Sequence, residues 1–194
     1  MAEVGVPAGA PNSLPRLQPF NDCAGPLLVL IGPPVAGKSR VGKRVARILD
    51  AAFIDTDRVI VAEHGPISEI FAERGEPAFR ALEAHAVIEA LEQCAVVALG
   101  GGAVMTPSVA AALTGRPVVL LTIAPEAAAE RLDPETRPLV RDGIGAWVDL
   151  VARRMPTYRA LATASWDTST RPIDHIAAEI AEWARDRARV AGGS

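Results

Sequence analysis

The chain has 194 residues, 49% of them hydrophobic, and its 20 basic and 23 acidic residues give a formal net charge of -3. This length and apolar content suffice for one hydrophobic core, so we expect a single domain with one active site. The near balance of charge argues against a nucleic acid or an anionic membrane as a partner. The longest apolar runs, 27–31 and 118–121, are far shorter than the roughly 20 residues that cross a bilayer.

Residues 1–25 contain prolines at every fourth position from Pro7 to Pro19 and few charges. They lack the basic start and the apolar stretch of a secretory signal, so we interpret them as a flexible tail. The two cysteines, Cys23 and Cys94, are too few for a disulfide framework and are not spaced as metal ligands. We therefore interpret them as inert thiols of a protein in the reducing cytoplasm.

From residue 27 onward, short apolar runs alternate with patterns of helical period. This alternation is typical of an α/β fold with three layers, in which helices cover both faces of a central parallel sheet. The sequence predicts strands at 27–31, 53–54, 95–99 and 118–123 and a helix from Lys38. Residues 131–145 are instead rich in charges and helix breakers, which predicts a mobile loop.

Residues 32–39, with the sequence GPPVAGKS, fit the phosphate-binding pattern G-x-x-x-x-G-K-[ST] between a predicted strand and a predicted helix. Glycines let backbone N–H groups turn toward phosphates, a lysine neutralises the β and γ oxygens, and a serine hydroxyl reaches Mg²⁺. A glycine-rich turn without a ligand is the alternative, and the strand-helix context argues against it. The residues expected to bind ATP here are Gly32, Val35, Ala36, Gly37, Lys38, Ser39 and Arg40.

Val35 occupies a position of this loop that is commonly glycine in small kinases. If the loop needs a positive φ there, a β-branched residue costs about 1–3 kcal/mol. Nucleotide affinity would then be low, and a P-loop module that binds nucleotide without catalysis stays an alternative.

Asp55 and Asp57 flank Thr56 at the end of the second predicted strand. The carboxyl edge of a parallel sheet is where open α/β proteins bind ligands, so we expect both acids beside the phosphate loop. If the strand stays extended, its period of two puts the carboxylates on one side, where one can serve Mg²⁺ and the other an acceptor hydroxyl. A pair of solvated loop acids is the alternative, because such residues are ordinary turn formers.

Six motifs follow one another in the chain: GPPVAGKS at 32–39, FIDTD at 53–57, FR at 79–80, GGG at 100–102, TRPL at 136–139 and YR at 158–159. Their order and spacing closely resemble shikimate kinases over residues 27–180. The resemblance implies a P-loop NTPase fold at 26–190, with a substrate-binding segment near 56–90 and a lid near 131–145. It also implies a monomeric transferase that uses ATP and Mg²⁺ to phosphorylate the 3-hydroxyl of shikimate in aromatic amino-acid biosynthesis.

The resemblance further implies roles for single residues. Asp57 matches the aspartate that binds the substrate hydroxyls and is the candidate base, and Asp55 matches the one that holds Mg²⁺ together with Ser39. Arginines grip carboxylates in bidentate fashion. The matched residues are Arg80 and Arg159 for the carboxylate, Gly100, Gly101 and Gly102 against the ring, Lys38 and Arg137 on the transferring phosphoryl group, and Arg131 with Arg171 near the adenine.

A gluconate kinase, or another small-metabolite kinase, is the alternative among enzymes. It would share the phosphate loop but need not share Arg80, the triple glycine and Arg159, and these three favour shikimate.

Overall fold

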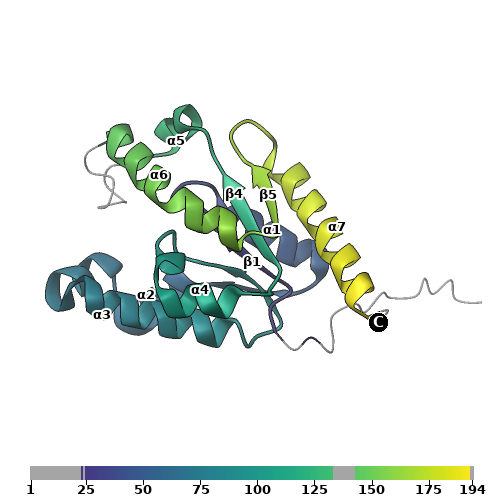
Figure 1. Ribbon diagram of the computed structural model, residues 1–194, viewed down its shortest axis with the longest axis horizontal. Coiled ribbons are helices and arrows are strands. Elements are labelled where there is room, and N and C mark those ends of the chain that lie inside the picture. Colours follow the sequence, from purple (N-terminus) through teal and green to yellow (C-terminus); the bar gives the residue numbers. More distant parts are fainter. Residues whose placement is uncertain (1–22, 24, 133–142, 193–194) are drawn as a thin grey trace, which may run out of the picture.

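The computed structural model describes residues 23, 25–132 and 143–192 (Figure 1). The predicted N-terminal tail, apart from Cys23 and Gly25, lies outside the described residues. So do residues 133–142 of the predicted lid, and with them Arg137.

Five parallel strands form the central sheet, in the order β2-β3-β1-β4-β5. β1 lies in the middle, and its Leu30 is opposite Ala98 of β3 on one side and Val119 of β4 on the other. Because β1 is paired on both edges and covered on both faces, all four of its residues are buried. The strands are β1 (Leu28–Ile31), β2 (Ala52–Asp55), β3 (Ala95–Ala98), β4 (Val118–Thr122) and β5 (Ala164–Asp167).

Helices cover both faces of this sheet (Figure 1). Alternate residues of β1 point to opposite faces, so Leu28 and Leu30 pack in the core under α1 and α7, whereas Val29 and Ile31 pack under α3 and α4. The predicted three-layer α/β fold is thereby confirmed. The helices are α1 (Lys38–Leu49), α2 (Thr56–His64), α3 (Ile67–Ala90), the 3-10 helix η1 (Ala103–Met105), α4 (Pro107–Leu113), α5 (Pro125–Arg131), α6 (Gly143–Leu161) and α7 (Ile173–Gly192).

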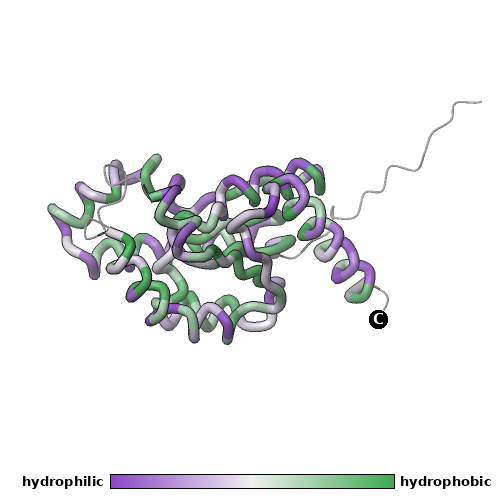
Figure 2. Tube along the Cα trace, turned by 90° about the horizontal axis from the view of Figure 1, so that it is seen from above, coloured by the Kyte–Doolittle hydropathy of each residue, from purple (hydrophilic) through white to green (hydrophobic). Residues whose placement is uncertain are grey.

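Hydrophobic segments gather in the interior, and hydrophilic ones line the outer turns of the helices (Figure 2). A third, smaller apolar cluster joins α2 to α3 through Ile60, Ile70 and Phe79. This pair of helices forms a small lobe beside the sheet, within the segment predicted to bind the substrate. Among the described helices, none combines the length and apolarity needed to span a bilayer.

The sequence did not predict strand β5, which pairs with β4 at the edge of the sheet. Its side chains alternate between half-buried and exposed, because only one of its faces packs on the core. Trp166 lies on the half-buried side and meets the ring of Trp183 at 5.9 Å between ring centroids. Such a short strand has no continuous apolar run to reveal it. It matters for function because it ends directly before Thr168.

Cys23 and Cys94 form a disulfide, with 5.7 Å between their Cα atoms. The interpretation of these residues as inert thiols is therefore wrong. The two cysteines lie just before β1 and β3, which are neighbours in the sheet, and the backbone N–H of Leu27 donates to the Ala95 carbonyl close by. Sequence spacing could not reveal the pair, since 71 positions separate the two residues.

Replacing Cys94 with Ser is expected to lower the free energy of unfolding by about 2–4 kcal/mol, because the bond closes a long loop of the unfolded chain. Urea unfolding with and without a reducing agent measures the effect. The reductant should destabilise the wild type to the level of the Cys94→Ser variant and leave the variant unchanged. Equal midpoints for the oxidised and reduced wild type would contradict this expectation.

Candidate active site

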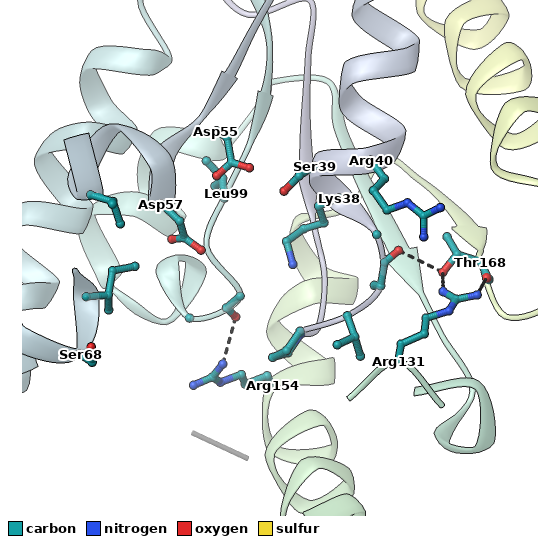
Figure 3. Close-up of a pocket in the computed structure, with 18 of the residues that line it drawn as sticks. Lys38, Ser39, Arg40, Asp55, Asp57, Ser68, Leu99, Arg131, Arg154 and Thr168 are labelled. Carbon is teal, nitrogen blue, oxygen red and sulfur yellow. Dashed lines mark hydrogen bonds between the residues drawn. The ribbon is translucent and has the colours of Figure 1, made fainter. Parts of the chain in front are cut away.

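A pocket of about 1070 Å³ opens at the carboxyl edge of the sheet (Figure 3). The phosphate loop after β1 and the start of α1 form its middle, with Lys38 and Ser39 pointing into it. Asp57 and Arg154 lie on one side of Lys38, whereas Arg131 and Thr168 lie on the other. The pocket thus has two ends with the phosphate loop between them, which suits the transfer of a group between two bound molecules.

The phosphate loop adopts a strained backbone at Val35, whose φ is 62°. This is the left-handed region that β-branched residues avoid at a cost of about 1–3 kcal/mol. Val35 also lines the pocket and packs against the large core cluster. The loop therefore does need a positive φ at Val35. A lowered nucleotide affinity as its consequence stays a prediction.

Lys38 reaches back over the phosphate loop and donates to the carbonyls of Gly32 at 2.8 Å and Pro33 at 3.0 Å. Gly32 itself lies behind the pocket wall, whereas Lys38 and Ser39 line it. The ammonium group is thus placed where the loop backbone curves, which is the position from which a lysine can meet phosphate oxygens.

Asp55 and Asp57 both line the pocket, but they reach it by a route other than the predicted one. β2 ends at Asp55 and α2 begins at Thr56, so the chain is not extended through Asp57. Asp55 is the N-cap of α2 and accepts from the Arg58 N–H at 3.4 Å, and Asp57 stands in the first turn. Strand periodicity was therefore the wrong reason for their proximity.

Thr56, between the two acids, is fully buried and points away from the pocket. Its hydroxyl donates to the Ala98 carbonyl at 3.4 Å and accepts from the Gly100 N–H at 3.3 Å. These bonds join the end of β2 to the loop after β3, so they fix the two acids relative to the triple glycine.

The triple glycine at 100–102 is required by the side chains that pack on it. A Cβ atom at Gly100 would lie 2.5 Å from the Asp57 carboxylate, and one at Gly102 would lie 2.5 Å from the Arg80 guanidinium. At Gly101 the nearest neighbour is Pro34 of the phosphate loop, at 3.3 Å. A Cβ atom at Gly100 or Gly102 would displace the Asp57 carboxylate or the Arg80 guanidinium, whereas one at Gly101 would only make a tight contact with Pro34. Glycine thus lets the acid and the arginine pack directly on this backbone segment.

Arg80 lies over Gly102 between two glutamates of α3. It donates to Glu83 at 2.6 Å and to Glu76 at 3.0 Å. The Glu83 side chain is 2% exposed and that of Glu76 is 63% exposed, so the two carboxylates differ in their surroundings. Burial raises the pKa of Glu83, and the guanidinium of Arg80 opposes that shift. A second nitrogen of Arg80, Nε, also donates to Glu76, at 3.2 Å. Because Glu83 is the buried partner, we expect it to orient Arg80 more strongly than the exposed Glu76 does.

A third arginine, Arg154, lines the pocket on the same side of Lys38 as Asp57 (Figure 3). It donates to the Gly101 carbonyl at 3.2 Å, and the buried hydroxyl of Tyr158 donates to the same oxygen. Burial raises the pKa of Tyr158 to about 12, so its phenol keeps its proton. The six sequence motifs do not include Arg154, so no role was predicted for it.

Arg159 does not reach the pocket, because it is exposed on the outer side of α6 and is not among the lining residues. It follows the buried Tyr158 by one residue, which is a rotation of about 100° around a helix. Arg154 precedes Tyr158 by four residues and therefore lies on the same helix face. Of these two arginines, α6 therefore brings Arg154 and not Arg159 to the pocket.

The opposite end of the pocket is built by Arg131 and Thr168. Arg131 donates to the carbonyls of Thr168 at 2.7 Å and Ser169 at 3.0 Å, which ties α5 to the segment after β5. Arg171 does not join them, since it is exposed, pairs with Glu179 of α7 and does not line the pocket. Its predicted place beside Arg131 is not what the structure shows.

Comparison with known proteins decides the family. The model of the shikimate kinase family matches residues 34–185 of the chain. A shikimate kinase of Corynebacterium efficiens is 41% identical over 161 residues, which cover 81% of this chain and 95% of that protein. A shikimate kinase of Mycobacterium leprae is 45% identical over 149 residues, with 74% and 75% covered.

The chain belongs to the shikimate kinase family. A solved shikimate kinase from Acinetobacter baumannii, in complex with shikimate, superimposes with a TM-score of 0.77 at 31% identity and covers 82% of this chain and 92% of its own. The predicted resemblance and the P-loop fold are thereby confirmed, as is the enzyme class, an ATP-dependent kinase and hence a transferase.

Within this shikimate kinase fold, the structure brings most of the predicted site residues together. The residues that line the pocket are Val35, Ala36, Gly37, Lys38, Ser39, Arg40, Asp55, Asp57, Gly101, Gly102 and Arg131. Gly32, Arg80 and Gly100 stand directly behind that wall, each in contact with a residue that faces the pocket or its loop. Arg159 and Arg171 lie elsewhere, and Arg137 is outside the described residues.

Proposed function

We propose that this protein transfers the γ-phosphoryl group of ATP to the 3-hydroxyl of shikimate, giving shikimate 3-phosphate and ADP. The observation that carries the proposal is the placement of Asp57 and Arg154 on one side of Lys38 in a single pocket. A carboxylate for a hydroxyl and an arginine for a carboxylate are the groups that a small hydroxy acid requires. The phosphate loop between the two ends then holds the group that is transferred.

Asp57 is the residue we assign to the acceptor hydroxyl. It lies in the first turn of α2, next to Gly100. Its carboxylate is close enough to Glu83 for the two charges to interact. A carboxylate at this position can accept the hydroxyl proton and direct the oxygen toward the phosphorus in line with the leaving group. Lys38 neutralises charge on the transferring phosphoryl group, and Arg137 is proposed to do so from the lid.

The substrate carboxylate is assigned to Arg154 together with Arg80. Both guanidinium groups contact the triple glycine, Arg154 through the Gly101 carbonyl and Arg80 over Gly102. Two forked donors that converge on one short segment can bind a carboxylate in bidentate fashion with a fixed orientation. Arg159 is replaced by Arg154 in this assignment.

Mg²⁺ fits the donor groups between the two ends of the pocket. The Ser39 hydroxyl and the Asp55 carboxylate both face the pocket, with Asp57 next to them (Figure 3). Among the described residues, no group of three or more His, Cys, Asp or Glu side chains could hold a metal ion. In kinases, Mg²⁺ takes one or two protein ligands and the rest from phosphates and water. When bound, the ion would neutralise phosphate charge beside Lys38.

We assign the adenine end of ATP to Arg131, which lines the pocket at the end away from Asp57. Its guanidinium is anchored by two backbone carbonyls, so its flat face is held in place for stacking on a base. Arg40 of α1 lines the same end and is exposed, where its charge can meet phosphate oxygens.

The two glutamates around Arg80 provide a matched pair of variants. Glu83→Gln is expected to raise KM for shikimate about tenfold or more, because a charged hydrogen bond contributes about 1.5–3 kcal/mol. Glu76→Gln is expected to change KM by less than about fivefold, since an exposed ion pair contributes about 0–1 kcal/mol. Steady-state kinetics at saturating ATP compare the two. Equal effects of both changes would show that Glu83 does not orient Arg80.

A coupled assay for ADP release, run with shikimate and with gluconate, tests the proposed reaction. Turnover that depends on shikimate is the expected result. Turnover with gluconate alone would point to the alternative small-metabolite kinase. Binding of ATP without turnover on either acceptor would point instead to a P-loop module that does not catalyse.

We further propose that the protein is a cytoplasmic monomer. A kinase that consumes ATP needs a compartment that supplies it, which supports the location, whereas the Cys23–Cys94 disulfide is unusual for a reducing compartment. Light scattering tests the monomer, and alkylation of thiols in freshly broken cells tests the redox state of the pair.

A further inference from the structure

The phosphate loop is held from both sides of Val35 by two buried side chains from distant parts of the chain. The indole N–H of Trp147 on α6 donates to the Pro34 carbonyl at 3.3 Å. The hydroxyl of Thr168, after β5, donates to the Ala36 carbonyl at 3.0 Å (Figure 3). The two acceptors are the carbonyls of Pro34 and Ala36, the residues on either side of Val35 with its strained backbone.

Both donors are themselves firmly placed. Trp147 and Thr168 are each 1% exposed. The single proton of the Thr168 hydroxyl is shared between the Ala36 carbonyl and the Thr122 carbonyl at the end of β4, both at 3.0 Å. Arg131 donates to the hydroxyl oxygen at 3.4 Å and to the backbone carbonyl of Thr168 at 2.7 Å. Trp147 shares one face of α6 with Arg154 and Tyr158, seven and eleven residues further on. The donors are therefore parts of the rigid core rather than mobile surface groups.

We propose that Trp147 and Thr168 are positioning residues that hold the phosphate loop in its nucleotide-binding shape against the strain at Val35. A β-branched residue favours a loop with negative φ, in which the backbone N–H groups no longer face one point. Two hydrogen bonds to the flanking carbonyls oppose that relaxation. The loop is then already in its binding shape before the nucleotide arrives, so no free energy of binding is spent on reshaping it.

This inference rests on nucleotide binding by the loop and not on the identity of the acceptor. It explains how a loop with valine at this position can serve a kinase. It also predicts coupling: with glycine at position 35 the loop has no strain to resist, so the two bonds should matter less.

The test measures binding of ADP, in the presence of magnesium chloride, by isothermal titration calorimetry. Thr168→Val, which keeps the side-chain shape but loses the hydroxyl, should raise the Kd about two- to tenfold, the range expected for one neutral hydrogen bond. Trp147→Phe, which keeps an aromatic ring but loses the N–H, should do the same. Thr168→Ser, which restores the hydroxyl, should bind as the wild type does.

The same two changes made in the Val35→Gly background complete a double-mutant cycle. Their effect on the Kd for ADP should fall below about twofold there, because the bonds have no strain to oppose. The Kd for shikimate should be unchanged in all variants, since a general loss of packing would weaken both ligands.

Equal weakening in the valine and glycine backgrounds would overturn the proposal, and so would ADP binding by Thr168→Val and Trp147→Phe that matches the wild type. If one of the two variants does not fold, the other decides, because the two donors act on opposite sides of Val35. If the enzyme did not turn over shikimate but the double-mutant cycle in ADP binding gave the expected coupling to Val35, the proposed acceptor would be wrong. The positioning role of Trp147 and Thr168 would still be supported.

Discussion

Replacing Asp57 with Asn is expected to lower kcat at least about 100-fold, the range that a general base contributes. Asn keeps the shape of the side chain and its contact with Gly100 but can no longer accept the hydroxyl proton. The Kd for ADP should change little, because Asp57 and the adenine end lie on opposite sides of Lys38. Steady-state kinetics with shikimate and calorimetry with ADP measure the two effects separately.

Asp55→Asn is the informative companion to that variant. Asp55 faces Ser39 and is proposed to serve Mg²⁺, so its loss should raise the magnesium concentration needed for half-maximal rate. Asp57→Asn should lower kcat at every magnesium concentration. A fully active Asp57→Asn enzyme would remove Asp57 from the mechanism, whatever the behaviour of Asp55→Asn.

Replacing Arg154 with Met is expected to raise KM for shikimate about 10- to 100-fold, because hydrogen bonds to a charged group contribute about 1.5–3 kcal/mol. Arg159→Met on the same helix should leave KM within about twofold, since an exposed side chain away from special features contributes within about 0.5 kcal/mol. The pair separates the arginine that the tertiary structure places in the pocket from the one that the sequence motif suggested. Initial-rate kinetics at saturating ATP provide the measurement.

A structural effect of Arg154→Met is separated from loss of binding by a second readout. The Arg154 guanidinium also bonds the Gly101 carbonyl, so thermal unfolding of both variants should be recorded. KM for ATP should stay near the wild-type value. If Arg159→Met raised KM for shikimate as strongly as Arg154→Met, the assignment from the pocket geometry would be wrong.

Much of the phosphate site follows from local sequence. The phosphate-loop motif places Lys38 and Ser39 at a strand-helix junction, because a short apolar run before it and a helical period after it leave few alternatives. At Val35, a position that is commonly glycine, the motif raised a positive φ as a condition, and the backbone has a φ of 62°. These features depend on neighbours within a few residues, so the chain order alone reveals them.

The pocket end proposed for the substrate is different, because its make-up depends on which face of a helix or strand is buried. Arg154 and Arg159 are five residues apart on α6, and only the packing of Tyr158 under Gly101 turns one of them inward. The same holds for β5, an edge strand without an apolar run, and for Thr168 at its end. Asp57 lies in the pocket because it stands at the start of helix α2, and not because of the alternation of side chains along a strand.

By itself, the sequence determined the α/β layering, the phosphate loop and the kinase family, because periodicity, glycine spacing and motif order are properties of a linear pattern. The tertiary structure decided the rest: which arginine of α6 faces the pocket, that Cys23 and Cys94 are joined, and that Trp147 and Thr168 bond the loop on either side of Val35. Those relations join residues far apart in the chain. They are set by how helices and strands pack, and no local pattern encodes them.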